Sequence, residues 1–303
     1  MANMNFSDML AATVEQLSEP QRLKGVFHPH GDGHPLPSGA VLEEIVLLLR
    51  SILFPGYYGK SSVNIHTLHY HIGVGVERLH HLLTQQIEAG LCFMETEGTT
   101  AVSSGIHPES ASKQQSAREL SALMIDRLPQ IRSTLATDVM AAYNGDPAAC
   151  STSEVIACYP IIKALTNYRV AHELHLLGVP LIPRMLTEMA HSETGIDIHP
   201  QATIGKYFTI DHGTGVVIGA TCIIGDNVKI YQGVTLGAKS FPLDDDGNPI
   251  KGIARHPIIG NNVVIYANAT VLGRITIGDN CVVGANVWVT DDMEAHTTKV
   301  NRF

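Results

Sequence analysis

The chain has 303 residues, 45% of them hydrophobic, which is enough for two domains with packed cores. A formal net charge of −9 argues against nucleic acid or an anionic membrane as the main partner, because both require a basic surface. The five cysteines show no CxxC spacing, so we expect neither disulfides nor zinc knuckles, and a reducing, cytoplasmic setting. No stretch approaches the ~20 apolar residues of a membrane span, so we expect no transmembrane helix.

The first part of the chain, residues 1–195, is predicted to be an α-helical domain. Residues 1–40 carry weak structural signals and no signal-peptide pattern, and we expect them to be mobile. Apolar residues then recur at helical spacing, and several of the runs end at glycine or proline. The predicted helical segments are 38–54, 76–91, 116–144, 153–178 and 180–195.

A different pattern begins at Ile198. An aliphatic residue recurs at every sixth position as far as Val216, resumes at Ile218 after a two-residue slip, and returns from Ile259 to Val289 after an interruption. A six-residue period fits one short strand plus one corner, with three such units closing each coil of a triangular prism.

We therefore predict an α+β chain in which residues 196–303 form a left-handed parallel β-helix of hexapeptide repeats. A loop at 239–254 is expected to leave the prism, because it is rich in Asp, Gly, Asn and Pro. The alternative is a generic β-rich domain, which the sustained register of the aliphatic positions disfavours.

Polar residues break the repeat at three places: Asp197 in DIHP, Asp211 and His212 in IDHGTG, and Arg255 and His256 in RHP. A packed prism has no internal pocket, so we expect any site to lie in a groove between neighbouring chains, which favours a trimer. Asp197 precedes His212 by roughly one coil. A carboxylate beside an imidazole would fix the tautomer of a general base that takes a proton from an alcohol. The alternative, an ordinary surface histidine, is disfavoured by Gly213 and Gly215, which permit a ligand to approach closely.

No metal is expected. The histidines of the prism half lack the spaced pair of a three-histidine zinc site. The histidines of HPHGDGH and HTLHYH could bind a metal adventitiously, but we interpret them as solvated surface. Cys222 and Cys281 fall on small, inward positions of the repeat, where core packing explains them, so no residue is a candidate covalent nucleophile.

The chain closely resembles the serine O-acetyltransferases, the hexapeptide-repeat enzymes of cysteine biosynthesis, over roughly residues 135–297. The resemblance lies in NGDPA, YPIIKALTNYRVAHEL, GIDIHPQATIGKYFTIDHGTGVVIGATCIIGDNVKIYQGVTLGAKS and RHPIIGNNVVIYANATVLGRITIGDNCVVGANVWV. It implies direct transfer of acetyl from acetyl-CoA to the hydroxyl of L-serine, giving O-acetyl-L-serine and CoA. It also implies that His212 is the general base and that Asp197 orients it.

The same resemblance implies binding roles for eight further residues. Asp146 and Asp211 would hold the serine ammonium, and Arg255 and His256 its carboxylate, since a zwitterion needs partners of both signs. Small residues would line the groove for the pantetheine arm of CoA: Gly237, Ala238, Ala267 and Ala285. The resemblance does not determine which residue binds the CoA phosphates, for which Lys239, Arg274 and Lys299 are candidates.

The resemblance also implies an assembly and partners. The expected assembly is a homotrimer, or a hexamer formed as a dimer of trimers, and L-cysteine would act as a feedback inhibitor. The chain ends at Phe303 without a long tail ending in isoleucine, which argues against the complex with O-acetylserine sulfhydrylase that the family forms through that tail. The alternatives are another hexapeptide acyltransferase, acting on a different amino acid or a sugar, and a binding scaffold without catalysis. Asp146 and Arg255 favour an amino acid, because a sugar carries no ammonium and carboxylate.

Overall fold

The computed structural model describes residues 5–23, 26, 36–59, 63–96 and 110–301. The HPHGDGH histidines and part of the stretch 1–40 lie outside these ranges. The chain forms two compact units, Met1–Leu36 and Pro37–Phe303. The first contains α1 (Phe6–Ser18) and a short 3-10 helix, Pro20–Leu23. Asn5 caps α1 by accepting a hydrogen bond from the Asp8 N–H, and no side chain of α1 is buried.

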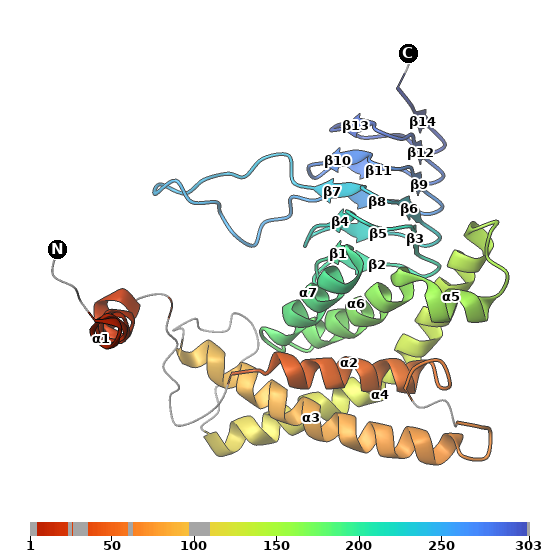
Figure 1. Cartoon of the computed structure of the whole chain (residues 1–303). Coiled ribbons are helices and arrows are strands. Elements are labelled where there is room, and N and C mark those ends of the chain that lie inside the picture. The colour runs from red at the N-terminus through yellow and green to blue at the C-terminus, as the bar shows by residue number, and fades with distance from the viewer. Residues whose placement is uncertain (1–4, 24–25, 27–35, 60–62, 97–109, 302–303) are drawn as a thin grey trace. The chain divides into compact units, whose positions relative to one another are not determined.

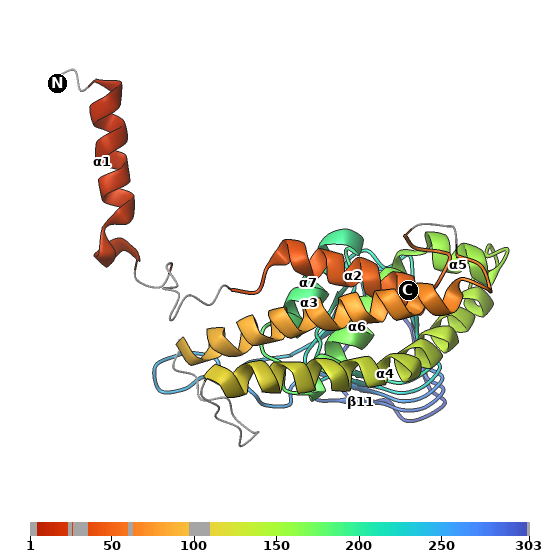
Figure 2. The same cartoon turned by 90° about the horizontal axis from the view of Figure 1, so that it is seen from below.

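The second unit begins with the predicted helices (Figure 1). They are α2 (Gly39–Leu53), α3 (Leu68–Thr96), α4 (Ser110–Gly145), α5 (Thr152–Cys158), α6 (Pro160–Leu176) and α7 (Ile182–Thr194). α3 packs between α2 and α4 (Figure 2), while α6 and α7 contact the first coil of the β-helix. None of the described helices is both long enough and apolar enough to cross a membrane.

One segment differs from the sequence prediction. Residues 153–178 were expected to form one helix but form two, α5 and α6, which break at Tyr159. Pro160 has no backbone N–H and its ring clashes with the preceding turn of a continuous helix, whereas it is well suited to the first position of a new one. Ser151 starts α5 by accepting a hydrogen bond from the Glu154 N–H at 3.1 Å.

The strands confirm the predicted parallel β-helix, which has three sheets numbered here in the order in which the chain enters them. Sheet 1 contains β1 (Asp197–Ile198), β4 (Val217–Ile218), β7 (Thr235–Gly237), β10 (Thr270–Leu272) and β13 (Trp288–Val289). Sheet 2 contains β2 (Thr203–Ile204), β5 (Ile223–Ile224), β8 (Ile258–Ile259) and β11 (Thr276–Ile277). Sheet 3 contains β3 (Thr209–Asp211), β6 (Lys229–Tyr231), β9 (Val264–Ile265), β12 (Val282–Val283) and β14 (Thr298–Lys299).

The first coil is longer than the next. Ile198 pairs with Ile218, twenty residues on, whereas Ile218 pairs with Leu236, eighteen residues on. The extra length lies at the corner after β3, where His212 has φ 59° and Gly213 has φ 91°. A Cβ on Gly213 would lie 2.5 Å from the Ile196 side chain, so this corner requires glycine. The two extra residues of the repeat therefore form a defined corner, and the His212 side chain projects outward from it.

A buried ion pair joins the helices to the first coil. Asp138 of α4 is fully buried and lies 3.1 Å from the guanidinium of Arg169 on α6. Arg169 also donates to the carbonyls of Ile204 and Gly205, and Asp138 accepts from the Phe208 N–H. These bonds hold the C-terminal end of α4 beside β3.

The interruption in the repeat leaves the prism after Gly237 and returns at Ile258, and it projects as an arm (Figure 1). Leu243 and Pro249 form an antiparallel bridge within the arm. At its base, the Arg255 guanidinium lies 5.7 Å from the ring centroid of Phe241. The arm therefore returns Arg255 and His256 to the wall of the prism.

Candidate active site

Two edges of the prism carry the polar residues. The histidine edge lies between sheets 3 and 1 and comprises His212, Gln232, Ala267 and Ala285. The arginine edge lies between sheets 1 and 2 and comprises His199, Thr221, Arg255, His256 and Arg274. Both edges flank sheet 1.

On the histidine edge, Asp211 and His212 follow each other at the end of β3. The His212 side chain is 74% exposed, and its Nε2 lies 3.9 Å from Oδ1 of Asp211. Asp211 is only 20% exposed and stands in register with Tyr231 of β6. The imidazole is therefore open to a ligand, while the carboxylate beside it is held in the wall.

Asp146 reaches the same place from the end of α4. Its carboxylate accepts hydrogen bonds from the Tyr159 hydroxyl at 2.5 Å and from the Ala148 N–H at 2.8 Å. The Tyr159 bond, followed by the Ala148 bond, lowers the pKa of Asp146, and the same contact raises the pKa of Tyr159 to about 12. Asp146 is thus held as an anion.

Lys229 of β6 contacts both Asp211 and the segment 145–146. Its Nζ donates to the Gly145 carbonyl at 2.6 Å and lies 3.2 Å from Oδ2 of Asp211. Burial lowers the pKa of Lys229, but hydrogen bonds to Tyr231 and Asp211 outweigh it, so the pKa lies above its ordinary value. A small pocket is lined by these groups, among them Asp146, Tyr159, Asp211 and Lys229.

The structure therefore brings Asp146, Asp211 and His212 together and adds two residues that the sequence analysis missed. Tyr159 had no signal beyond its place before Pro160. Lys229 could have been noticed as a charged residue inside the repeat unit VKIYQG, at a position facing outward from a strand.

Arg255 and His256 lie on the other edge. The His256 Nδ1 accepts from the Thr221 N–H at 3.1 Å, which leaves Nε2 to carry the proton of the neutral ring. The ring packs on Gly219, where a Cβ would lie 2.1 Å from His256 Cδ2. Burial, then the charges of Arg255 and Arg274, lowers the pKa of His256 to about 4. His256 is therefore a neutral hydrogen-bond donor at neutral pH.

This low pKa predicts a pH-dependent stability. The free imidazole has a pKa of 6.5, so the unfolded chain binds more protons than the folded chain between that value and about 4. We expect the free energy of unfolding to fall as the pH is lowered through this window, and to fall less steeply in His256→Asn, whose amide oxygen can replace Nδ1. Urea unfolding across the window measures both slopes. His81→Asn, at an exposed histidine of α3, is the control, and equal slopes in the two variants would contradict the prediction.

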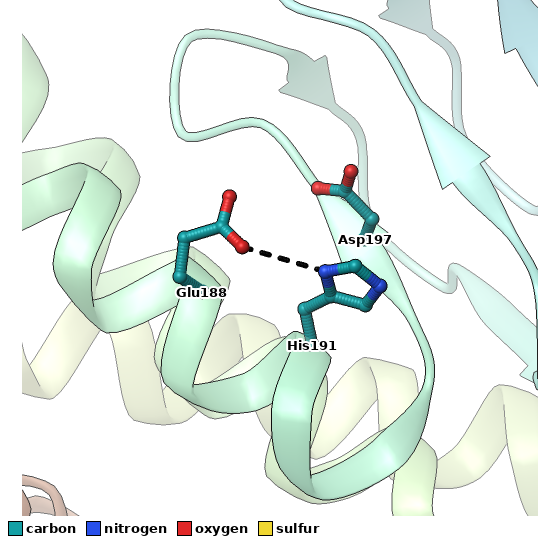
Figure 3. A group of neighbouring side chains, drawn as sticks. All are labelled: Glu188, His191 and Asp197. Atoms are coloured by element: carbon teal, nitrogen blue, oxygen red, sulfur yellow. Dashed lines mark hydrogen bonds and ion pairs between the residues drawn. The ribbon is translucent and has the colours of Figure 1, made fainter. Parts of the chain in front are cut away.

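Asp197 lies on β1, at the entry of the prism. Its backbone pairs with the next coil, since the Asp197 N–H donates to the Val216 carbonyl at 2.9 Å. Its carboxylate lies close to Glu188 and His191 of α7 (Figure 3). Within the described ranges, no hydrogen bond or ion pair joins it to His212, so the predicted pair of these two residues remains a prediction.

The four predicted groove-lining residues divide between the two edges. Gly237 is the last residue of β7, and Ala238 follows it on the arginine edge. On the histidine edge, Asp211 is in register with Tyr231, the Asn268 N–H donates to Gln232 O and the Asn286 N–H donates to Ala267 O. Gln232, Ala267 and Ala285 therefore lie on successive coils above His212. One chain therefore presents two candidate half-sites on separate edges, one with carboxylates and His212, the other with Arg255 and His256.

Family models, related sequences and solved structures that match this chain give consistent results. The family models "Bacterial transferase hexapeptide (six repeats)" and "Hexapeptide repeat of succinyl-transferase" match residues 256–291 and 215–241. A plasmid-encoded serine acetyltransferase of Synechococcus elongatus is 51% identical over 86% of this chain and 81% of its own length. The solved serine acetyltransferase 1 of Entamoeba histolytica, in complex with L-cysteine, is 33% identical with a TM-score of 0.72, over 95% of this chain and 94% of that one. Soybean serine acetyltransferase complexed with serine is 30% identical with a TM-score of 0.54, over 88% of this chain and 98% of that one.

Proposed function

The chain belongs to the serine acetyltransferase family, and on that premise we propose that it transfers acetyl from acetyl-CoA to the hydroxyl of L-serine, giving O-acetyl-L-serine and CoA. The observation that carries this proposal is the pair of half-sites flanking sheet 1. L-serine is a zwitterion with an alcohol, and the half-sites offer carboxylates for its ammonium, Arg255 for its carboxylate and His212 for its hydroxyl proton.

In this proposal His212 acts as the general base. Its exposed ring takes the hydroxyl proton as the serine oxygen attacks the acetyl carbonyl carbon of acetyl-CoA. The thiolate of CoA then leaves, and the imidazolium returns the proton to it. Asp197 remains the predicted orienting carboxylate.

We further propose that the serine site is shared between protomers of a trimer. If three copies turn sheet 1 toward a common axis, the histidine edge of each meets the arginine edge of the next. The outer face of sheet 1 carries the apolar side chains Val217 and Trp288, which are 37% and 63% exposed, as suits a surface that is covered in an assembly. The small residues of both edges would then line one groove for the pantetheine arm.

A mixing experiment tests this sharing. His212→Ala and Arg255→Ala should each be nearly inactive, whereas co-refolded mixtures should recover about a quarter of wild-type turnover, because one groove in four pairs an intact His212 with an intact Arg255. Acetyl-CoA consumption measures it. The double variant mixed with either single variant is the control and should stay inactive. A 1:1 mixture without recovery would place the whole site in one chain.

L-cysteine is proposed as an inhibitor of the same site. It carries the ammonium and carboxylate of serine with a thiol in place of the hydroxyl, so the same half-sites fit it. The similarity to the Entamoeba histolytica enzyme, solved with L-cysteine, supports this.

The reaction itself is tested by acetyl-CoA consumption with L-serine, L-homoserine and amino sugars. We expect turnover with L-serine well above that with the others. Turnover with amino sugars alone would reject the proposal in favour of a different hexapeptide acyltransferase.

A further inference from the structure

A group of potential metal ligands lies beside the histidine edge, at the junction of α7 and β1. Glu188 and His191 project from the same side of α7, three residues apart, and Asp197 returns over them from β1 (Figure 3). Gly195 makes this return possible, since it ends α7 in the left-handed conformation with φ 72°. One donor atom from each side chain lies within 4.8 Å of the other two.

The donors are of a kind that binds transition metals. One imidazole nitrogen and two carboxylate oxygens match the nitrogen and oxygen ligands of Zn²⁺ and Co²⁺. Bonds of about 2.0–2.1 Å in a tetrahedral site place two ligand atoms about 3.4 Å apart. Nδ1 of His191 and Oε2 of Glu188 are separated by 3.4 Å. The carboxylate of Asp197 lies within 4.8 Å of both atoms and would be the third ligand, with a water as the fourth.

Neighbouring groups hold these donors in place. The other oxygen of Glu188, Oε1, pairs with Arg184 one turn earlier on α7, which leaves Oε2 facing His191. β1 is fixed by its pairing with β4, and α7 packs along α6. A ligating carboxylate whose other oxygen is hydrogen-bonded to a neighbouring side chain is typical of metal sites.

We propose that Glu188, His191 and Asp197 bind a divalent transition-metal ion such as Zn²⁺, and that the ion inhibits acetyl transfer by keeping the Asp197 carboxylate beside His191, where it cannot pair with His212. No metal was expected from the sequence, because His191 belongs neither to the prism histidines nor to the histidine-rich stretches HPHGDGH and HTLHYH that were considered there. The binding half of this proposal stands on the geometry of three side chains. The inhibitory half rests on the proposed function and on the predicted role of Asp197.

Binding is tested with Co²⁺, whose visible absorption reports nitrogen and oxygen ligands. The full chain, freed of metal with a chelator, is titrated with Co²⁺ and followed by absorption and calorimetry. The wild type should take up one Co²⁺ per chain more than His191→Ala, and Glu188→Gln should bind it at least about tenfold more weakly than the wild type. His69→Ala, at an exposed histidine of α3, is the control and should match the wild type. Equal uptake by the wild type, His191→Ala and His69→Ala would overturn the site.

Inhibition is tested separately with Zn²⁺ on serine-dependent turnover. Zn²⁺ should lower kcat of the wild type several-fold and leave His191→Ala unaffected, while the two proteins turn over equally without metal. Equal inhibition of both would overturn the inhibitory half. If the chain does not acetylate serine at all, the proposed function fails, and the Co²⁺ titration still decides the site.

Discussion

His212→Ala is expected to lower turnover with L-serine by about 10²- to 10⁴-fold, the usual contribution of a positioned general base. Without the imidazole, the serine hydroxyl keeps its proton in the groove and remains a poor nucleophile. The affinity for acetyl-CoA should change little, because the proposed mechanism places His212 at the reacting hydroxyl rather than along the pantetheine arm. Steady-state kinetics with both substrates varied measures kcat and each KM.

The control for this variant must have the same backbone conformation as His212. His212 has φ 59°, so an alanine there adds strain as well as removing the imidazole. His296 is another exposed histidine with φ 64°, on a different edge of the prism. His296→Ala carries the same strain and should keep wild-type turnover. Comparable losses in both variants would attribute the effect to the backbone, and an active His212→Ala would remove the general base from the mechanism.

Asp138→Ala is expected to reduce the free energy of unfolding by about 3–5 kcal/mol, the cost of leaving one partner of a buried ion pair alone. Asp138 is fully buried, and the Arg169 side chain is 9% exposed. The variant strands the guanidinium and also leaves the Phe208 N–H without its acceptor. Urea unfolding followed by circular dichroism measures the loss.

An exposed ion pair supplies the comparison. Glu44→Ala removes a partner of Arg78, and both of those side chains are about half exposed. Solvent already screens that pair, so a loss of about 0–1 kcal/mol is expected. If the two variants lost equal stability, the Asp138–Arg169 pair would not be what holds the helices on the prism. Because Asp146 directly follows α4, we also expect a higher KM for L-serine in any Asp138 variant that still folds.

Parts of this fold can be predicted from the sequence because they depend only on local interactions. Each aliphatic residue from Ile198 to Val289 needs only its own corner and the coil beneath it to become buried, so the period of six predicts the β-helix. The slip at His212 was visible for the same reason, because two extra residues must form a corner of their own. Pro160 shows the limit of this reasoning, since the helical spacing continued across a residue that divides the helix.

The sequence by itself determined the β-helix, its exposed histidine corner and the polar residue types around it. Only the tertiary structure decided which of them meet: Lys229 reaches the Gly145 carbonyl across 84 positions of the chain. It also placed Arg255 and His212 on different edges and Asp197 beside His191. The physical reason is that the repeat is specified by contacts between adjacent coils, whereas the partners of a polar side chain depend on how distant helices pack against those coils.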